Sequence, residues 1–180
     1  MKVLIFTIAT AFLITACEKD ITTPPKPNET ELITTCILTL TDSANASNVV
    51  KATFRDPDGE GGNAATQFDS IRLKANTTYN TQIVLLDESK SPADTISKEI
   101  LKEQNDHQFF FNNTTGLQII YADKDTNTPS LPVGLSTIWR TTSPSAGTVT
   151  VILKHQPGTK KGNQADGDTD IELKYNTVIR

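Results

Sequence analysis

Short β-prone runs separated by turn residues follow one another from residue 31 to the C-terminus. The runs are rich in Thr, Ile, Val and aromatic residues, and clusters of Asp, Gly, Asn and Pro separate them. This spacing is typical of sandwiches and barrels rather than of alternating strands and helices. We therefore predict an all-β fold, an immunoglobulin-like antiparallel β-sandwich. Its expected strands are 32–41, 48–55, 68–74, 78–87, 107–111, 116–122, 134–142, 147–154 and 170–179.

Residues 92–105 break this pattern and predict one short helical insertion. Ile96, Ile100 and Leu101 recur at helical spacing among Lys and Glu, and Asp94 is placed to cap the helix start. Trp139 lies in a run with apolar residues at alternating positions, which indicates a core anchor rather than an exposed ligand platform.

The N-terminus has the features of a secretion signal. Lys2 precedes an almost wholly apolar run over residues 3–14. This run is too short for a transmembrane helix, which needs roughly 20 apolar residues. Residues 14–17 (ITAC) resemble the bacterial lipobox, so we expect residues 1–16 to be removed and Cys17 to be lipidated. The alternative is an ordinary cleaved signal that leaves Cys17 as a free thiol.

The mature chain divides into a tether and a domain. Residues 17–30 form the lipid anchor and a polar linker with three prolines at 24, 25 and 27, which predicts an extended chain. Residues 31–180 form the β-sandwich domain, which is long enough for one hydrophobic core. The protein should therefore be tethered to a membrane and carry its domain on a spacer.

Composition excludes some functions. The formal net charge of −4 argues against nucleic-acid binding, which requires basic patches. With Cys17 lipidated, Cys36 has no intramolecular disulfide partner and is expected in the core. His107 and His155 are far apart and lack an HExxH pattern, so they are poor candidates for a zinc site; we expect His107 in the core and His155 at a solvated turn. No nucleophile elbow or P-loop is present, and the sequence predicts no catalytic residue.

Three acidic stretches, 56–62 (DPDGEGG), 123–127 (DKDTN) and 166–170 (DGDTD), are candidate calcium loops. Alternating carboxylates on a turning backbone can converge on a hard cation such as Ca²⁺. The first stretch resembles the opening of an EF-hand loop, although its twelfth position is Gln67 rather than glutamate. Ordinary turns remain the alternative, because Asp, Asn and Gly are common turn formers. The candidate ligands are Asp56, Asp58, Glu60, Asp123, Asp125, Asp166, Asp168 and Asp170.

The order of the strands predicts where these stretches lie. If successive strands alternate in direction, the loops after the second, sixth and eighth expected strands emerge at the same end of the sandwich. The first strand also begins there, so the linker and the acidic stretches should share the membrane-proximal end.

Seven stretches of the chain carry a resemblance to a known family: 31–35, 54–59, 85–89, 107–110, 121–125, 153–157 and 167–171. Together they resemble a family of small lipoproteins from Bacteroidetes, especially flavobacteria, often found near TonB-dependent outer-membrane transporters. The resemblance implies an anchor in the outer membrane, at the cell surface or the periplasmic face. The family is often labelled a type 1 periplasmic binding fold superfamily. That fold has two doubly wound α/β lobes, for which this chain is too short and too poor in helices, so the β-sandwich remains the expected fold.

The function that these features favour is a membrane-anchored envelope lipoprotein without enzymatic activity. It would act as a binding or accessory module for nutrient uptake, with a TonB-dependent transporter as the partner that the resemblance implies. Two alternatives remain: a structural envelope lipoprotein whose loops are made rigid by Ca²⁺, and a hydrolase with an unrecognised site.

The anchor can be tested by replacing Cys17 with serine. We expect Cys17→Ser to abolish metabolic labelling with palmitate and to move the protein from the membrane fraction to the soluble fraction, because the lipid chains supply the membrane affinity. Cys36→Ser is the matched control and should leave labelling unchanged. Retention of label in the Cys17 variant would exclude lipidation at this residue.

Overall fold

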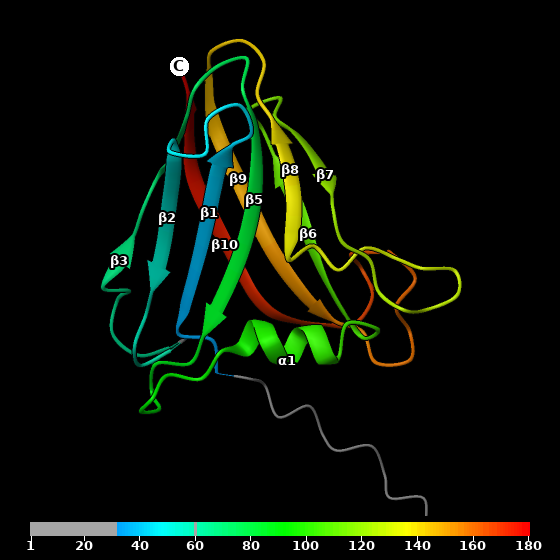
Figure 1. Cartoon of the computed structure of the whole chain (residues 1–180). Coiled ribbons are helices and arrows are strands. Elements are labelled where there is room, and N and C mark those ends of the chain that lie inside the picture. The colour runs from blue at the N-terminus through cyan, green and yellow to red at the C-terminus, as the bar shows by residue number, and fades with distance from the viewer. Residues whose placement is uncertain (1–31, 60) are drawn as a thin grey trace, which may run out of the picture.

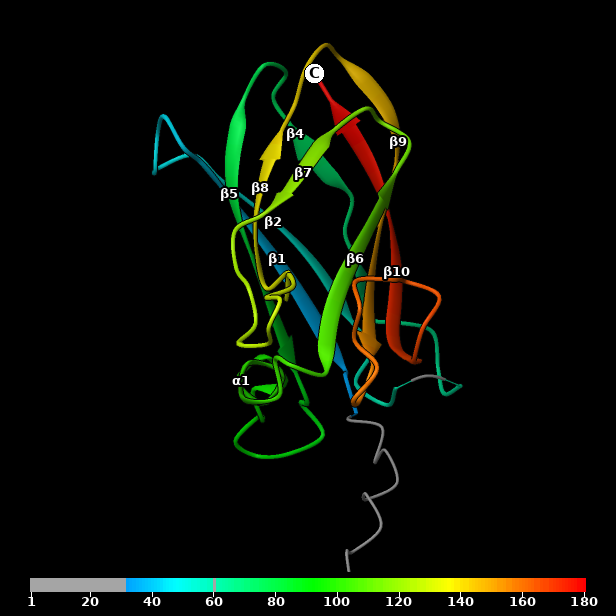
Figure 2. The same ribbon diagram turned by 90° about the vertical axis from the view of Figure 1, so that its right-hand side faces the viewer.

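Two β-sheets pack face to face in the computed structural model, which describes residues 32–59 and 61–180 (Figures 1 and 2). The six-stranded sheet has the order β3-β2-β1-β5-β8-β7 and the four-stranded sheet the order β4-β10-β9-β6. All pairs are antiparallel except β4 with β10, which is parallel. The predicted all-β sandwich with a short helical insertion is confirmed. Its strands are β1 (Thr35–Asp42), β2 (Val49–Arg55), β3 (Gln67–Phe68), β4 (Ile71–Leu73), β5 (Thr78–Leu86), β6 (His107–Asn113), β7 (Gln118–Tyr121), β8 (Ser136–Arg140), β9 (Ser145–His155) and β10 (Asp168–Ile179).

The core between the sheets is built from alternating positions of the strands. Because side chains of a strand point to opposite faces in turn, every second residue of β5, and of β10 from Leu173 onward, is buried and those between are more exposed. Trp139 is fully buried as predicted, and its Nε1 donates a hydrogen bond to Thr137 Oγ1 at 2.8 Å, so no indole donor is left unsatisfied. Cys36 also lies in the core, where burial raises the pKa of its thiol to about 12. The inward residues of the two strands are Tyr79, Thr81, Ile83 and Leu85, and Leu173, Tyr175, Thr177 and Ile179.

Helix α1 (Ile96–Lys102) lies across the lower end of the sandwich (Figure 1). Ile96 and Ile100 are buried beneath β5, whereas Leu101 is 54% exposed. The N-cap residue is Thr95, one residue after the predicted Asp94, whose carboxylate accepts a hydrogen bond from the Thr95 amide at 2.9 Å. Among the described residues, no helix is both long and apolar enough to cross a bilayer.

The predicted strand 68–74 is divided between the two sheets. β3 pairs with β2 in one sheet, and β4 pairs with β10 in the other. Asp69 stabilises the crossing: its amide donates to Thr53 O at 2.9 Å, and its Oδ2 accepts from the Thr53 amide at 2.9 Å. β3 runs parallel to β1, since both are antiparallel to β2, and β4 runs parallel to β10. Because β1 and β10 both run away from the end where α1 lies (Figure 1), β3 and β4 have the same direction. The alternation of strand direction is therefore preserved despite the extra strand.

The end at which β1 begins also carries the loops after β2, β7 and β9, as the strand order predicted (Figure 1). The loops 122–135 and 156–167 lie beside α1 at this end, and the C-terminus lies at the opposite end (Figures 1 and 2). We call this the entry end, because Leu32 leads into β1 here.

Gly134 offers a test of packing near this end. Its φ is +93°, and an added Cβ would lie 2.7 Å from Phe109 Cβ and 3.0 Å from Tyr121 Cε1. Gly116 has a similar φ of +75° but no atom within 4 Å of such a Cβ. Gly116→Ala should cost about 1–2 kcal/mol of unfolding free energy from backbone strain alone. Gly134→Ala should cost about 1–3 kcal/mol more from overpacking, measured by urea denaturation. Equal losses would contradict tight packing at Gly134.

Candidate functional site

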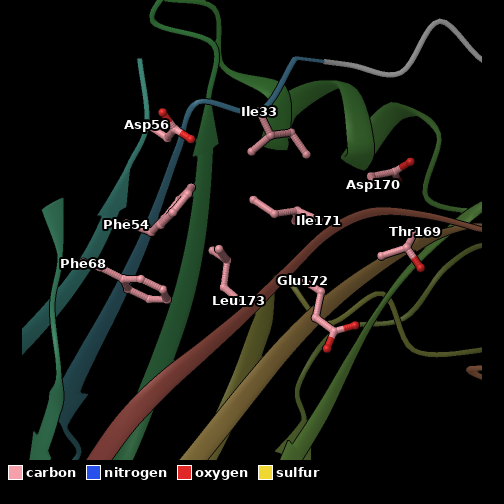
Figure 3. A pocket seen from close by; sticks show the side chains of 9 residues that line it. All are labelled: Ile33, Phe54, Asp56, Phe68, Thr169, Asp170, Ile171, Glu172 and Leu173. Carbon is pink, nitrogen blue, oxygen red and sulfur yellow. The ribbon is translucent and has the colours of Figure 1, made fainter. Parts of the chain in front are cut away.

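A cleft of about 510 Å³ opens between the two sheets near the entry end (Figure 3). One wall comes from β2 and β3, the other from the first half of β10, and Ile33 lies between them. The cleft forms where β3 has only two residues and the chain then leaves for the opposite sheet, which shortens this edge of the sandwich. The lining residues are Ile33, Phe54, Asp56, Phe68, Thr169, Asp170, Ile171, Glu172 and Leu173.

The apolar part of the cleft is built on aromatic contacts. The rings of Phe54 and Phe68 meet edge to face with centroids 5.2 Å apart, and Phe68 meets Tyr175 in the same way at 5.1 Å. Phe68 is nevertheless 49% exposed, so much of its ring faces the opening. Such partly exposed aromatic surface, flanked by carboxylates, is a common composition for small-molecule sites.

Asp56 supplies a carboxylate to the same cleft from the loop after β2 (Figure 3). It is only 9% exposed, and among the described residues its buried Oδ1 has no hydrogen-bond partner. Burial and the neighbouring Asp58 carboxylate raise the pKa of Asp56. The pKa of Asp58 is lowered instead, because its carboxylate accepts hydrogen bonds from the amide and side chain of Asn63. This loop therefore holds Asp58 in a turn and directs Asp56 toward the cleft.

The third acidic stretch lies at the start of β10, on the other wall. Asp170 and Glu172 line the cleft, and Thr169 accepts a hydrogen bond from Lys154 Nζ at 3.0 Å. Asp168 is exposed, and the carbonyl of Asp166 accepts a hydrogen bond from Gln156 Nε2 at 2.9 Å. The cleft thus combines one carboxylate of the first acidic stretch with one of the third.

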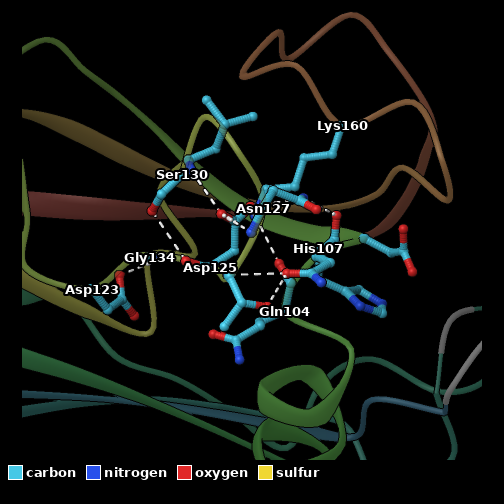
Figure 4. Close-up of polar contacts among 12 residues, drawn as sticks. Gln104, His107, Asp123, Asp125, Asn127, Ser130, Gly134 and Lys160 are labelled. Atoms are coloured by element: carbon cyan, nitrogen blue, oxygen red, sulfur yellow. Dashed lines mark hydrogen bonds and ion pairs between the residues drawn. The ribbon is translucent and has the colours of Figure 1, made fainter.

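The second acidic stretch has a different role (Figure 4). Asp123 accepts hydrogen bonds from the amides of Gly134 and Ser136 at 2.7 and 2.9 Å, which fixes the return of the chain into β8. Asp125 accepts hydrogen bonds from the amide of Leu131 at 2.8 Å and that of Asn127 at 3.2 Å. Both carboxylates therefore organise the loop itself.

Asp125 also forms a buried ion pair with Lys160 (Figure 4). Lys160 Nζ lies 2.9 Å from Asp125 Oδ2, and the two side chains are 1% and 0% exposed. The ammonium also donates to the carbonyl of Gln104 at 2.8 Å. Burial raises the pKa of Asp125, but Lys160 and the loop amides lower it more, so it lies below its ordinary value. Lys160 thus occupies the position beside Asp125 that the sequence suggested for a metal ion.

The predicted calcium ligands that the structure describes share the entry end but do not form one cluster. Within the described residues, no group of three carboxylates comes close enough to hold an ion. Asp123 and Asp125 are engaged in the second loop, Asp56 and Asp170 line the cleft, and Asp58 is held in its turn. Cys17 and Glu60 lie outside the described residues. Calcium binding by these loops stays a prediction.

Sequence reasoning missed the cleft aromatics, Lys160 and a cluster of histidines. His155 ends β9 and stacks on His107, the first residue of β6, instead of lying at a solvated turn. The alternation of strand direction already placed both histidines at the entry end, but it did not reveal that their strands are neighbours.

Comparison with known proteins gives no further assignment: no family model, no curated protein and no solved structure matches this chain.

The ion pair predicts a large effect of removing one partner. Lys160→Met should reduce the free energy of unfolding by about 3–5 kcal/mol, because it leaves the Asp125 carboxylate buried without a counter-ion. The double variant Asp125→Leu/Lys160→Met removes both charges and should recover most of the loss. Denaturant unfolding at neutral pH measures both; an unchanged Lys160→Met variant would contradict the role of the pair.

The pH dependence of the unfolding free energy tests the same ion pair in a second way. The pKa of Asp125 is lower in the folded protein than in the unfolded chain, where it is about 3.9. The stabilisation is therefore complete above about pH 4 and is lost as the pH falls through the folded value. The unmodified protein should lose more stability on acidification below about pH 4 than the double variant does.

Proposed function

We propose that this protein is a lipid-anchored, non-enzymatic binding module of the cell envelope, whose cleft takes up a small ligand. The cleft between β2–β3 and β10 carries the proposal, since it combines exposed aromatic surface with carboxylates at its rim. The lipobox-like segment and the proline-containing linker support the anchored part. The family resemblance supports a role as an accessory to a TonB-dependent outer-membrane transporter.

The composition of the cleft favours one class of ligand. Phe54, Phe68 and Leu173 offer an apolar surface, and Figure 3 shows them directed toward one another. Asp56 and Glu172 carry the polar character of the rim, and no lysine or arginine is among the described residues that line the cleft. Carboxylates accept hydrogen bonds and attract cations. We therefore expect a ligand with an apolar or aromatic body and a cationic or hydrogen-bond-donating end.

The alternative function, a structural envelope lipoprotein whose loops are made rigid by Ca²⁺, has less support. The second loop is already held by direct amide hydrogen bonds and by Lys160, so it does not require Ca²⁺ for its conformation. The hydrolase alternative is favoured by no arrangement among the described residues.

The ligand class can be tested with tryptamine, which joins an indole ring to an ammonium group, and with indole-3-acetate, its anionic counterpart. The chain from residue 17 carrying Cys17→Ser avoids interference from lipid and detergent. NMR titration should show tryptamine binding at least about tenfold more tightly, with shifts confined to the cleft. Glu172→Gln should weaken tryptamine binding about fivefold, which corresponds to about 1 kcal/mol.

Phe68→Ser and Leu101→Ser separate the cleft from general surface hydrophobicity. Both side chains are about half exposed, but only Phe68 lines the cleft. Phe68→Ser should weaken binding of both indoles, and Leu101→Ser should weaken neither. Equal affinity for the two indoles, or equal effects of the two substitutions, would overturn the proposed ligand class.

A further inference from the structure

The two histidines of the chain face each other across neighbouring strands of the four-stranded sheet. His107 of β6 and His155 of β9 are directly paired in register. Their rings stack with centroids 4.4 Å apart and 7° between the ring planes. Glu103, the C-cap residue of α1, lies beside them, with its Oε2 3.9 Å from His107 Nδ1.

We infer that Glu103, His107 and His155 form a binding site for a divalent transition-metal ion of the zinc type. Each of the three residues offers one ligand atom, and these atoms lie within 4.8 Å of one another. Imidazole nitrogens and a carboxylate oxygen are ligands that Zn²⁺ favours. Three protein ligands leave a fourth position of a tetrahedral ion for water. None of the three ligand residues lines the cleft, so the site does not rest on the ligand proposed there, although Asp170 lies between the two.

The distances require a small contraction when the ion binds. Zinc bonds of about 2.0–2.1 Å place tetrahedral ligand atoms about 3.4 Å apart, so ligand atoms up to 4.8 Å apart must approach by up to about 1.4 Å. The Glu103 side chain is 57% exposed and His155 is partly exposed, so both can adjust, whereas His107 is 4% exposed and fixed by its surroundings. The nitrogen lone pairs of an imidazole lie in the plane of its ring, so two stacked rings cannot both point a lone pair at the same ion. We therefore expect the His155 ring to rotate out of the stack when the ion binds.

Two carboxylates flank His107, those of Glu103 and Asp170. Its Nδ1 donates a hydrogen bond to the Glu103 carbonyl oxygen at 3.2 Å, whereas its Nε2 lies 3.8 Å from Asp170 Oδ2. Binding of the ion at Nδ1 therefore breaks this hydrogen bond and moves the ring proton to Nε2. A carboxylate on that side of a metal-bound histidine favours this tautomer, and Asp170 lies there at ion-pair distance.

Metal binding can be tested on the full chain, purified in detergent and treated with chelator. Co²⁺ serves as the probe because it replaces Zn²⁺ and gives visible absorption bands that report tetrahedral coordination. We expect a saturable signal with one ion per chain, displaced by Zn²⁺. Ca²⁺ and Mg²⁺ should not displace it, because they prefer oxygen ligands. Displacement by Zn²⁺ but not by Ca²⁺ also distinguishes this site from a calcium site in the acidic loops.

Two substitutions assign the signal to these residues. His155→Gln should abolish the tetrahedral bands, and Glu103→Gln should weaken Co²⁺ binding at least about tenfold. The Glu103 side chain is 57% exposed, so its replacement leaves the core undisturbed. Glu99→Gln, on the same helix but outside the group, should bind Co²⁺ normally and serves as the matched control. Absence of saturable binding, or unchanged binding in both His155→Gln and Glu103→Gln, would overturn the site.

Discussion

The buried ion pair between Lys160 and Asp125 holds together the end of the sandwich where the candidate sites lie. Lys160 comes from the loop after β9 and Asp125 from the loop after β7, and the same ammonium bonds the carbonyl of Gln104 just beyond α1. A buried charge is tolerated only with a partner and well-placed hydrogen bonds. The three segments therefore constrain one another, and the start of β6 and the end of β9 are positioned with them.

This internal cation explains why three similar acidic stretches have different roles. In the second stretch, the lysine and the loop amides satisfy Asp125, so the carboxylate stabilises the fold. In the first, Asn63 holds Asp58 while Asp56 lines the cleft. In the third, Asp170 already belongs to β10, so the alternation of side chains along the strand decides which way its carboxylate points. An alternating acidic sequence specifies a turn, but the segments packed against it decide what its carboxylates do.

The strand pattern and the shared end of the acidic loops could be predicted from the sequence, because both depend on local periodicity and on strand direction. The division of 68–74 between the sheets could not, because it depends on Asp69 bonding Thr53 of another strand. The histidine pair was missed for a related reason. Strand order along the chain does not determine which strands are neighbours, and β6 and β9 become neighbours only through the sheet order β4-β10-β9-β6. Local sequence reveals the elements and their directions, whereas sites formed between distant strands depend on their pairing.

Asp170 connects the two candidate sites. It lines the cleft, and its Oδ2 lies 3.8 Å from Nε2 of His107, while its side chain is only 7% exposed. Electrostatic interactions over such distances are much stronger in a partly buried environment than in water. A positive charge at the histidines therefore attracts the Asp170 carboxylate and reduces the negative potential that it contributes to the cleft. A cationic ligand in the cleft competes for the same carboxylate. If both proposed sites bind cations, the two ligands compete for one shared side chain, without a change of fold.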